Sequence, residues 1–116
     1  MDEGHFNIFN TGNSVFMGNL AGRVDDLSDN RNVFIGNSAG QFNTFGQNNV
    51  AVGYRALRAN VDGANNVVIG KDAMRRITTG DNNVGIGSNV MSNLTSSDNN
   101  ISIGYNSLLS LSLIHI

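Results

Sequence analysis

Apolar residues alternate with small or polar ones in six short segments that recur along the chain at almost constant spacing. Each segment begins with asparagine or serine, continues with three mostly apolar residues and ends with a glycine. The closing glycines keep a 17-residue spacing in every interval except the first, which is longer by a single position. They are Gly18, Gly36, Gly53, Gly70, Gly87 and Gly104. A period near twenty is typical of a stacked solenoid in which each repeat forms one coil.

Each segment is expected to be a short strand, with its first and third apolar residues on one face because side chains alternate. We expect these two positions to point inward, and the first position then forms a buried column: Val33, Val50, Val67, Val84 and Ile101. The middle position then points outward and forms an apolar stripe: Phe16, Phe34, Ala51 and Val68. Because exposed apolar patches mark interaction surfaces, this stripe is the candidate trimer face, and the alternative is a set of scattered exposed apolar residues.

A second short strand is expected after each glycine, where a small residue such as Ala56 recurs. The glycine then forms the corner between the two strands, and a corner often needs a positive φ. Turn-rich stretches such as Ile77-Thr78-Thr79-Gly80 bring the chain round to the next repeat. One coil buries too little apolar surface to offset the backbone entropy of its residues, so several coils must stack.

Asparagine opens five of the six segments, at Asn32, Asn49, Asn66, Asn83 and Asn100. In the last four of these a second asparagine stands directly before the first. Side-chain amides stacked in register can hydrogen-bond to one another along the axis of parallel coils. The alternative is that these residues only form turns, since asparagine tolerates the left-handed backbone conformation.

Composition excludes several classes of function. The net charge is -2 with only 14% charged residues, so there is no basic stripe to support nucleic-acid binding. The chain has no cysteine, which excludes disulfides and thiolate metal sites. No apolar run is long enough to cross a membrane, so membrane insertion by this segment is not expected. The N-terminus also lacks the basic and apolar regions of a signal peptide.

Catalytic chemistry finds little support in the sequence. His5 precedes the first repeat and His115 lies near the end, so no histidine stands at a recognisable spacing from a nucleophile or metal ligand. Ser38 lies in Gly-Asn-Ser-Ala-Gly, which superficially suggests a serine elbow, but a structural corner is the favoured interpretation. We therefore expect no enzyme activity, no catalytic residue and no cofactor.

Two charged clusters remain. Asp25, Asp26 and Asp29 lie in the one spacer that is a residue longer, and such oxygen clusters can bind calcium. The spacing of a calcium loop is absent, so a solvated acidic loop is favoured and no metal site is expected. The second cluster is a small basic patch, more typical of a solubilising rim than of a ligand site. It comprises Arg55, Arg58, Arg75 and Arg76.

The phrase Asn-Asn-Val-x-Ile-Gly, followed by x-x-Ala-Leu/Met and a Thr-Thr-Gly-like turn, resembles the repeats of two related groups. One is the YadA-like head of trimeric autotransporter adhesins, and the other is the shaft of phage tail fibres. The resemblance covers roughly residues 13–110. It implies an all-β fold, a left-handed parallel β-roll with 17-residue coils in each chain of a trimer. A triple-stranded β-helix, in which three chains alternate, is the alternative.

The same resemblance implies a function. The chain is expected to be a non-catalytic shaft or head segment of a homotrimeric surface or tail fibre that presents a binding domain. The alternative is an adhesin head that binds host matrix or glycans directly. The expected partners are two further copies of the chain and a host-cell or matrix receptor. The expected location is a virion tail fibre or the bacterial cell surface. The spacing of the repeats is closer to the fibre-shaft type, because the adhesin heads have a shorter repeat.

Three segments are expected along the chain. Residues 1–12 form a lead-in or the end of an earlier repeat, and residues 13–110 form the six repeats. Residues 111–116 break the pattern and read as the translation of a common sequencing-library transposon adapter. We interpret them as an artefact outside the fold. The natural protein is accordingly expected to continue past Ser110.

Overall fold

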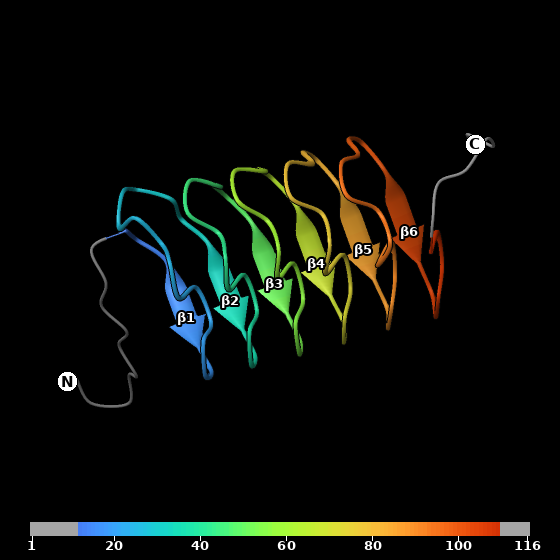
Figure 1. Ribbon diagram of the computed structural model, residues 1–116, viewed down its shortest axis with the longest axis horizontal. Helices are drawn as coiled ribbons and strands as arrows, with labels where there is room; N and C mark the ends of the chain where they lie inside the picture. The colour runs from blue at the N-terminus through green and yellow to red at the C-terminus, as the bar shows by residue number, and fades with distance from the viewer. Residues whose placement is uncertain (1–11, 110–116) are drawn as a thin grey trace, which may run out of the picture.

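A computed structural model describes residues 12–109 of the chain as a row of stacked coils (Figure 1). The expected lead-in up to residue 11 and the adapter-like end lie outside the described residues. Each coil contributes one three-residue strand, and the six strands follow one another in sequence order within a single parallel sheet. The strands are β1 (Val15–Met17), β2 (Val33–Ile35), β3 (Val50–Val52), β4 (Val67–Ile69), β5 (Val84–Ile86) and β6 (Ile101–Ile103). The chain is therefore an all-β parallel solenoid, as the repeat predicts.

The register of the sheet reproduces the sequence period. Val33 pairs with Val50, and Val50 pairs with Val67, so each coil advances by one 17-residue repeat. The longer first spacer is absorbed between β1 and β2, where Val15 pairs with Val33. Consecutive strands of the same chain pair directly. In a triple-stranded β-helix, strands of two other chains would separate them, so the coils belong to a single-chain solenoid.

The two faces of the sheet are the reverse of the prediction. The middle residues Phe34, Ala51 and Val68 are fully buried, so the candidate trimer face lies in the core, with Phe16 packed against it. The first-position residues, predicted to point inward, lie on the outside. Val33, Val50, Val67 and Val84 are partly exposed, and Ile101 is 73% exposed.

The reason for the reversal is the turn that follows each strand, which packs against the middle residue. A Cβ on Gly40 would overlap the ring of Phe34, with Cγ only 2.6 Å away, and a Cβ on Gly22 would overlap Phe16 equally closely. In later coils the same turn position carries a large residue and the strand residue is small. These later turn residues are Leu57, Met74, Met91 and Leu108, opposite Ala51, Val68, Gly85 and Ser102. Core volume is therefore shared between the strand and the turn of each coil.

The second strand predicted for each coil is absent from the described residues, and this prediction is wrong. The chain after each glycine forms consecutive turns instead. In the third coil, for example, Arg55 has a φ of 56° and Leu57 a φ of 53°, and these left-handed residues prevent a continuous strand. These turns still bond from coil to coil, since the Leu57 amide donates to the Ala73 carbonyl at 3.0 Å.

The glycine column behaves as predicted. Gly36, Gly53, Gly70 and Gly87 have φ between 126° and 136°, where residues with a Cβ are strained. Close approach of neighbouring coils is a second reason for glycine. A Cβ on Gly53 would lie 2.6 Å from the Gly70 carbonyl oxygen. The column therefore sets both the corner and the spacing between coils.

The asparagine column forms the predicted ladder of amides. The backbone N–H of Asn66 and its side-chain Nδ2 both donate to Asn49 Oδ1 at 3.0 Å. The same Nδ2 also donates to the Gly80 carbonyl at 2.8 Å. The same pattern joins Asn83 to Asn66, and Asn100 to Asn83. Asn32, Asn49, Asn66 and Asn83 are fully buried. In the first coil a serine, Ser14, replaces the asparagine, and its Oγ accepts a hydrogen bond from the backbone N–H of Asn32 at 2.9 Å.

The asparagines directly before this ladder have the other role that the sequence allows. Asn48, Asn65, Asn82 and Asn99 have φ between 57° and 61°, in the left-handed region. Both interpretations of the paired asparagines are therefore correct: the first residue of each pair forms a turn, and the second forms the ladder. This division follows from geometry: only the second asparagine points into the coil, where an amide must find partners.

A second, shorter amide column was not predicted. Asn60 Nδ2 donates to Asn43 Oδ1 at 2.6 Å, and both residues are fully buried. The next coil carries the apolar Ile77 at this position, so the column ends there. Asn60 Oδ1 is consequently the one buried side-chain polar atom without a hydrogen bond within residues 12–109.

Candidate functional site

The outer face of the sheet, formed by the first and third residues of every strand, is apolar over all six strands. The first-position column is Val15, Val33, Val50, Val67, Val84 and Ile101. The third-position column is Met17, Ile35, Val52, Ile69, Ile86 and Ile103. Exposure is 40% at Ile69 in a central coil, and it reaches 44% at Met17 and 66% at Ile103 in the first and last described coils. Purely parallel sheets are normally covered on both faces, so this outer face has the character of a contact surface.

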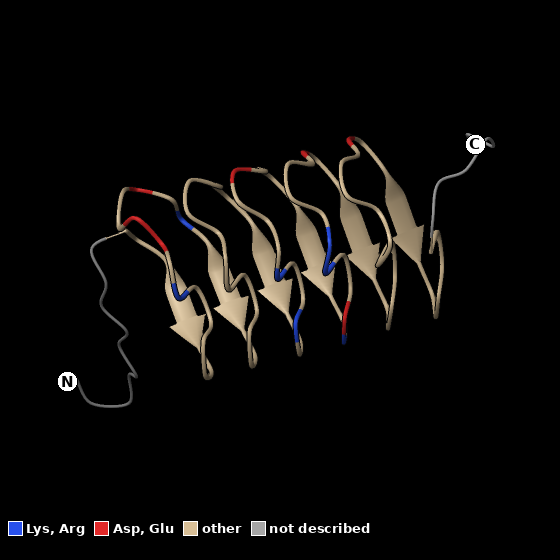
Figure 2. Cartoon of the chain, viewed as in Figure 1, with Lys and Arg blue, Asp and Glu red and all other residues tan. Residues whose placement is uncertain are grey.

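Charge is unevenly distributed over the coils. Figure 2 shows basic positions gathered on the turns of the central coils, while most acidic positions lie on the long loops along the opposite edge. Five of the seven basic residues of the chain fall between residues 55 and 76, against two acidic residues, Asp62 and Asp72. The charge of the chain is therefore separated although its total is small.

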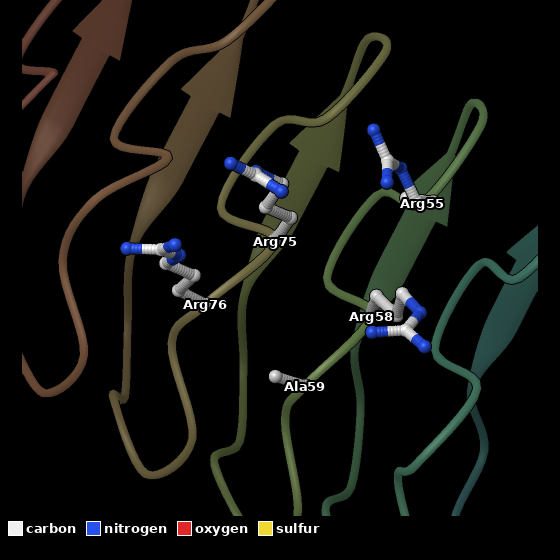
Figure 3. Close-up of a pocket in the computed structure, with 5 residues that line it drawn as sticks. All are labelled: Arg55, Arg58, Ala59, Arg75 and Arg76. Carbon is white, nitrogen blue, oxygen red and sulfur yellow. The ribbon is translucent and has the colours of Figure 1, made fainter.

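The basic patch expected from the sequence forms a cavity in the structure. This arginine cavity has a volume of about 260 Å³ and is lined by Arg55, Arg58, Ala59, Arg75 and Arg76 (Figure 3). Its lining comes from the turns of two adjacent coils, because Arg75 and Arg76 stand one full repeat after Arg58 and Ala59. The small side chain of Ala59 leaves the space that the arginines surround.

Two of the four arginines are held in place by neighbouring side chains. Arg55 forms a two-point ion pair with Asp72, with Nε to Oδ1 at 2.6 Å and Nη2 to Oδ2 at 3.1 Å. The hydrogen bond to Asp72 raises the pKa of Arg55 above its ordinary value. Arg58 donates from Nε to Gln41 Oε1 at 3.2 Å and lies over the Phe42 ring at 4.9 Å.

The other two arginines leave the cavity with excess positive charge. Within the described coils no ion pair reaches Arg75 or Arg76. Asp72 compensates the charge of Arg55 alone, because both of its oxygens bind that guanidinium. The cavity is therefore suited to a negatively charged group.

The acidic loop that raised a calcium alternative forms a hydrogen-bonded turn. Asp25 Oδ2 accepts from the Leu27 amide at 2.9 Å, and Asp26 Oδ1 accepts from the amide and Oγ of Ser28 at 3.0 and 2.7 Å. The bonds from Ser28 lower the pKa of Asp26. Asp29 pairs with Arg31 at 3.2 Å. Residues 12–109 contain no cluster of three or more metal-ligating side chains.

Ser38 has the surroundings of a turn residue. It is buried, has a φ of 62°, and its Oγ donates to Asn37 Oδ1 at 2.9 Å. Both histidines lie outside the described residues. No helix in the described part of the chain is long and apolar enough to cross a membrane.

Comparison of the chain with protein-family models, with curated proteins and with solved structures finds no match. The relationship to adhesin heads and fibre shafts therefore stays a prediction, based on the resemblance of the repeat phrase. The outer face and the arginine cavity are the two surfaces from which a function can be argued.

Proposed function

We propose that the coils form a non-catalytic structural segment, a shaft or head, of a homotrimeric surface or tail fibre. The observation that carries this proposal is the outer face, which stays apolar from β1 to β6 without one polar residue in either column. An uncovered apolar surface of this length favours association, since burying it removes apolar area from water.

The periodicity of the outer face favours another copy of the chain as the partner. Its side chains repeat once per coil, at a strand spacing of about 4.8 Å. A surface with the same rise keeps its side chains in register along the whole row, whereas a partner of different rise loses register after a few coils. Copies that lie side by side with parallel axes satisfy this condition. Three copies, and a left-handed coil, are what the resemblance to fibre and adhesin repeats implies.

Such a trimer places the turns and loops outward and the sheets near the common axis. The chain then spaces whatever precedes and follows it along the fibre, which is the role of a shaft. The alternative role, direct adhesion to host matrix or glycans, is favoured by one observation, the arginine cavity.

Sedimentation equilibrium of the full chain tests the proposed assembly. We expect the mass of three chains, and we expect Val52→Lys combined with Ile69→Glu to weaken association by at least about 100-fold, because it buries charge in an apolar contact. Val52 and Ile69 are paired across β3 and β4, so the two opposite charges lie next to each other. Their attraction is expected to leave the fold of the single chain intact.

The matched control places the same two charges on exposed apolar residues of the turns, as Phe45→Lys with Val61→Glu. We expect this variant to keep the wild-type mass. A wild-type chain that is monomeric, folded and heat-resistant would show that the outer face needs no cover. Trimers that survive the substitutions at Val52 and Ile69 would place the contact elsewhere.

A further inference from the structure

We propose that the arginine cavity binds an oxyanion group, a carboxylate or a sulfate, carried by an acidic polysaccharide. The inference goes beyond the structural role proposed above and does not depend on the number of chains in the assembly. It is carried by the arrangement of the four guanidinium groups over two adjacent coils.

Arg58 and Arg75 occupy equivalent positions in neighbouring coils, so their backbones are separated by about one strand spacing of 4.8 Å. Like charges directly opposite each other destabilise paired chains. The fold does not demand this pair, since the coils on either side carry the uncharged Gln41 and Ser92 at the same position. A shared anion between the two guanidinium groups would convert the repulsion into two charge-assisted contacts.

Part of the cavity is already organised for such a ligand. Asp72 fixes the guanidinium of Arg55, while Gln41 and Phe42 fix that of Arg58. Side chains that are held before binding lose less conformational entropy when a ligand arrives. Arginine also offers a planar fork of donors, which matches the paired oxygens of carboxylate and sulfate groups. Arg75 and Arg76, which are without ion pairs in residues 12–109, supply the charge that remains uncompensated.

The size and surroundings of the cavity favour a sugar chain over a nucleic acid. Its volume of about 260 Å³ suits one small charged unit, and the exposed aromatic residues Tyr54 and Phe42 flank the arginines, 46% and 38% exposed. Aromatic rings offer apolar area to the faces of sugar rings. Beyond these two coils most of the charged residues are acidic, and the net charge of the whole chain is -2, which disfavours a long uniform polyanion.

Isothermal titration calorimetry of the full chain at low salt tests the proposal with four probes. The probes are a heparin oligosaccharide for sulfate, an oligogalacturonate for carboxylate, neutral dextran, and single-stranded DNA for phosphate. We expect at least one of the two acidic sugars to bind, dextran not to bind, and DNA to bind more weakly than that sugar. Added salt is expected to weaken binding because exposed charges are screened.

The double variant Arg58→Gln with Arg75→Gln tests whether the cavity is the binding site. We expect it to bind at least about 10-fold more weakly, which corresponds to a loss of about 1.4 kcal/mol of binding free energy. The matched control, Arg23→Gln with Arg31→Gln, removes the same charge from coils away from the cavity. It is expected to change affinity less than about twofold. Circular dichroism verifies that both variants keep the wild-type fold.

Three outcomes overturn the proposal. The first is that neither acidic sugar binds better than dextran. The second is that both double variants lose the same affinity, which would mean that the effect depends only on total charge. Tighter binding of DNA would assign the cavity to phosphate chains instead. Binding of heparin alone or of oligogalacturonate alone supports the proposal and identifies the sulfate or the carboxylate as the group recognised.

Discussion

Replacing Gly70 by valine is expected to destabilise the folded chain by about 3 kcal/mol or more. The φ of Gly70 is 136°, a conformation in which a β-branched residue is strained. A side chain there also has no room, because its Cβ would overlap the carbonyl group of Gly87, with the carbonyl carbon 2.6 Å away. Neighbouring coils would have to separate, which breaks the sheet between β4 and β5. Urea unfolding followed by far-ultraviolet circular dichroism measures the loss.

Gly104→Val provides the matched control. Gly104 has a similar φ of 123°, but among residues 12–109 a Cβ there meets nothing closer than the Cβ of Ser107 at 4.0 Å. This variant carries the backbone strain without the overlap, so we expect it to cost about 1–3 kcal/mol, less than Gly70→Val. Equal losses for the two variants would mean that the close approach of the coils contributes nothing.

Ala51→Phe is expected to destabilise the chain by about 3 kcal/mol on its own, and the loss is expected to be largely restored by adding Leu57→Gly. Ala51 and Leu57 are both fully buried and belong to one core cluster. A phenylalanine at this middle position requires the space that Leu57 fills. The two coils that have phenylalanine there have glycine in the turn.

The double variant imitates those coils. Its new ring would continue the stack of Phe16 and Phe34, whose centroids are 5.4 Å apart. Glycine at position 57 also accepts the left-handed φ of 53° without strain. We expect the double variant to unfold within about 1 kcal/mol of wild type and the coupling energy to exceed about 2 kcal/mol. Additive losses would refute the exchange of volume between strand and turn. Each single variant and the pair are compared in the same urea experiment.

The features that depend on the period alone could be predicted from the sequence. Six similar phrases at a regular spacing determine a stack of parallel coils, because only neighbouring repeats can bury one another's surfaces. The glycine corners and the asparagine ladder follow from the chemistry of those residues at fixed register. The positive φ of Gly53 and the bonds from Asn66 to Asn49 could both be predicted on this basis.

The inward and outward faces could not be read from alternation, because a three-residue strand has the same pattern whichever way it faces. The deciding signal lies outside the strand. A large middle residue such as Phe34 accompanies glycine at position 40, whereas Ala51 accompanies Leu57. This inverse relation in size marks the middle residue as core, and a strand considered alone does not contain it.

The arginine cavity required both the period and the turn geometry. The 17-residue separation of Arg58 from Arg75 places them in neighbouring coils, which the sequence already contains. The space between them depends on Ala59 and on left-handed turns where a second strand was expected. The charge cluster was therefore visible in the sequence, but its concave shape was not.

The rise of the chain per repeat tests the central claim, that one chain forms the solenoid by itself. The protein has no cysteine, so Asn19→Cys and Tyr105→Cys allow two spin labels at exposed, equivalent positions five coils apart. Pulsed electron paramagnetic resonance, with labelled chains diluted in unlabelled ones, measures their separation. One strand spacing per coil predicts about 24 Å, broadened by the label tethers. A separation of about 72 Å, three strand spacings per coil, would contradict the account, because the strands would then alternate among three chains.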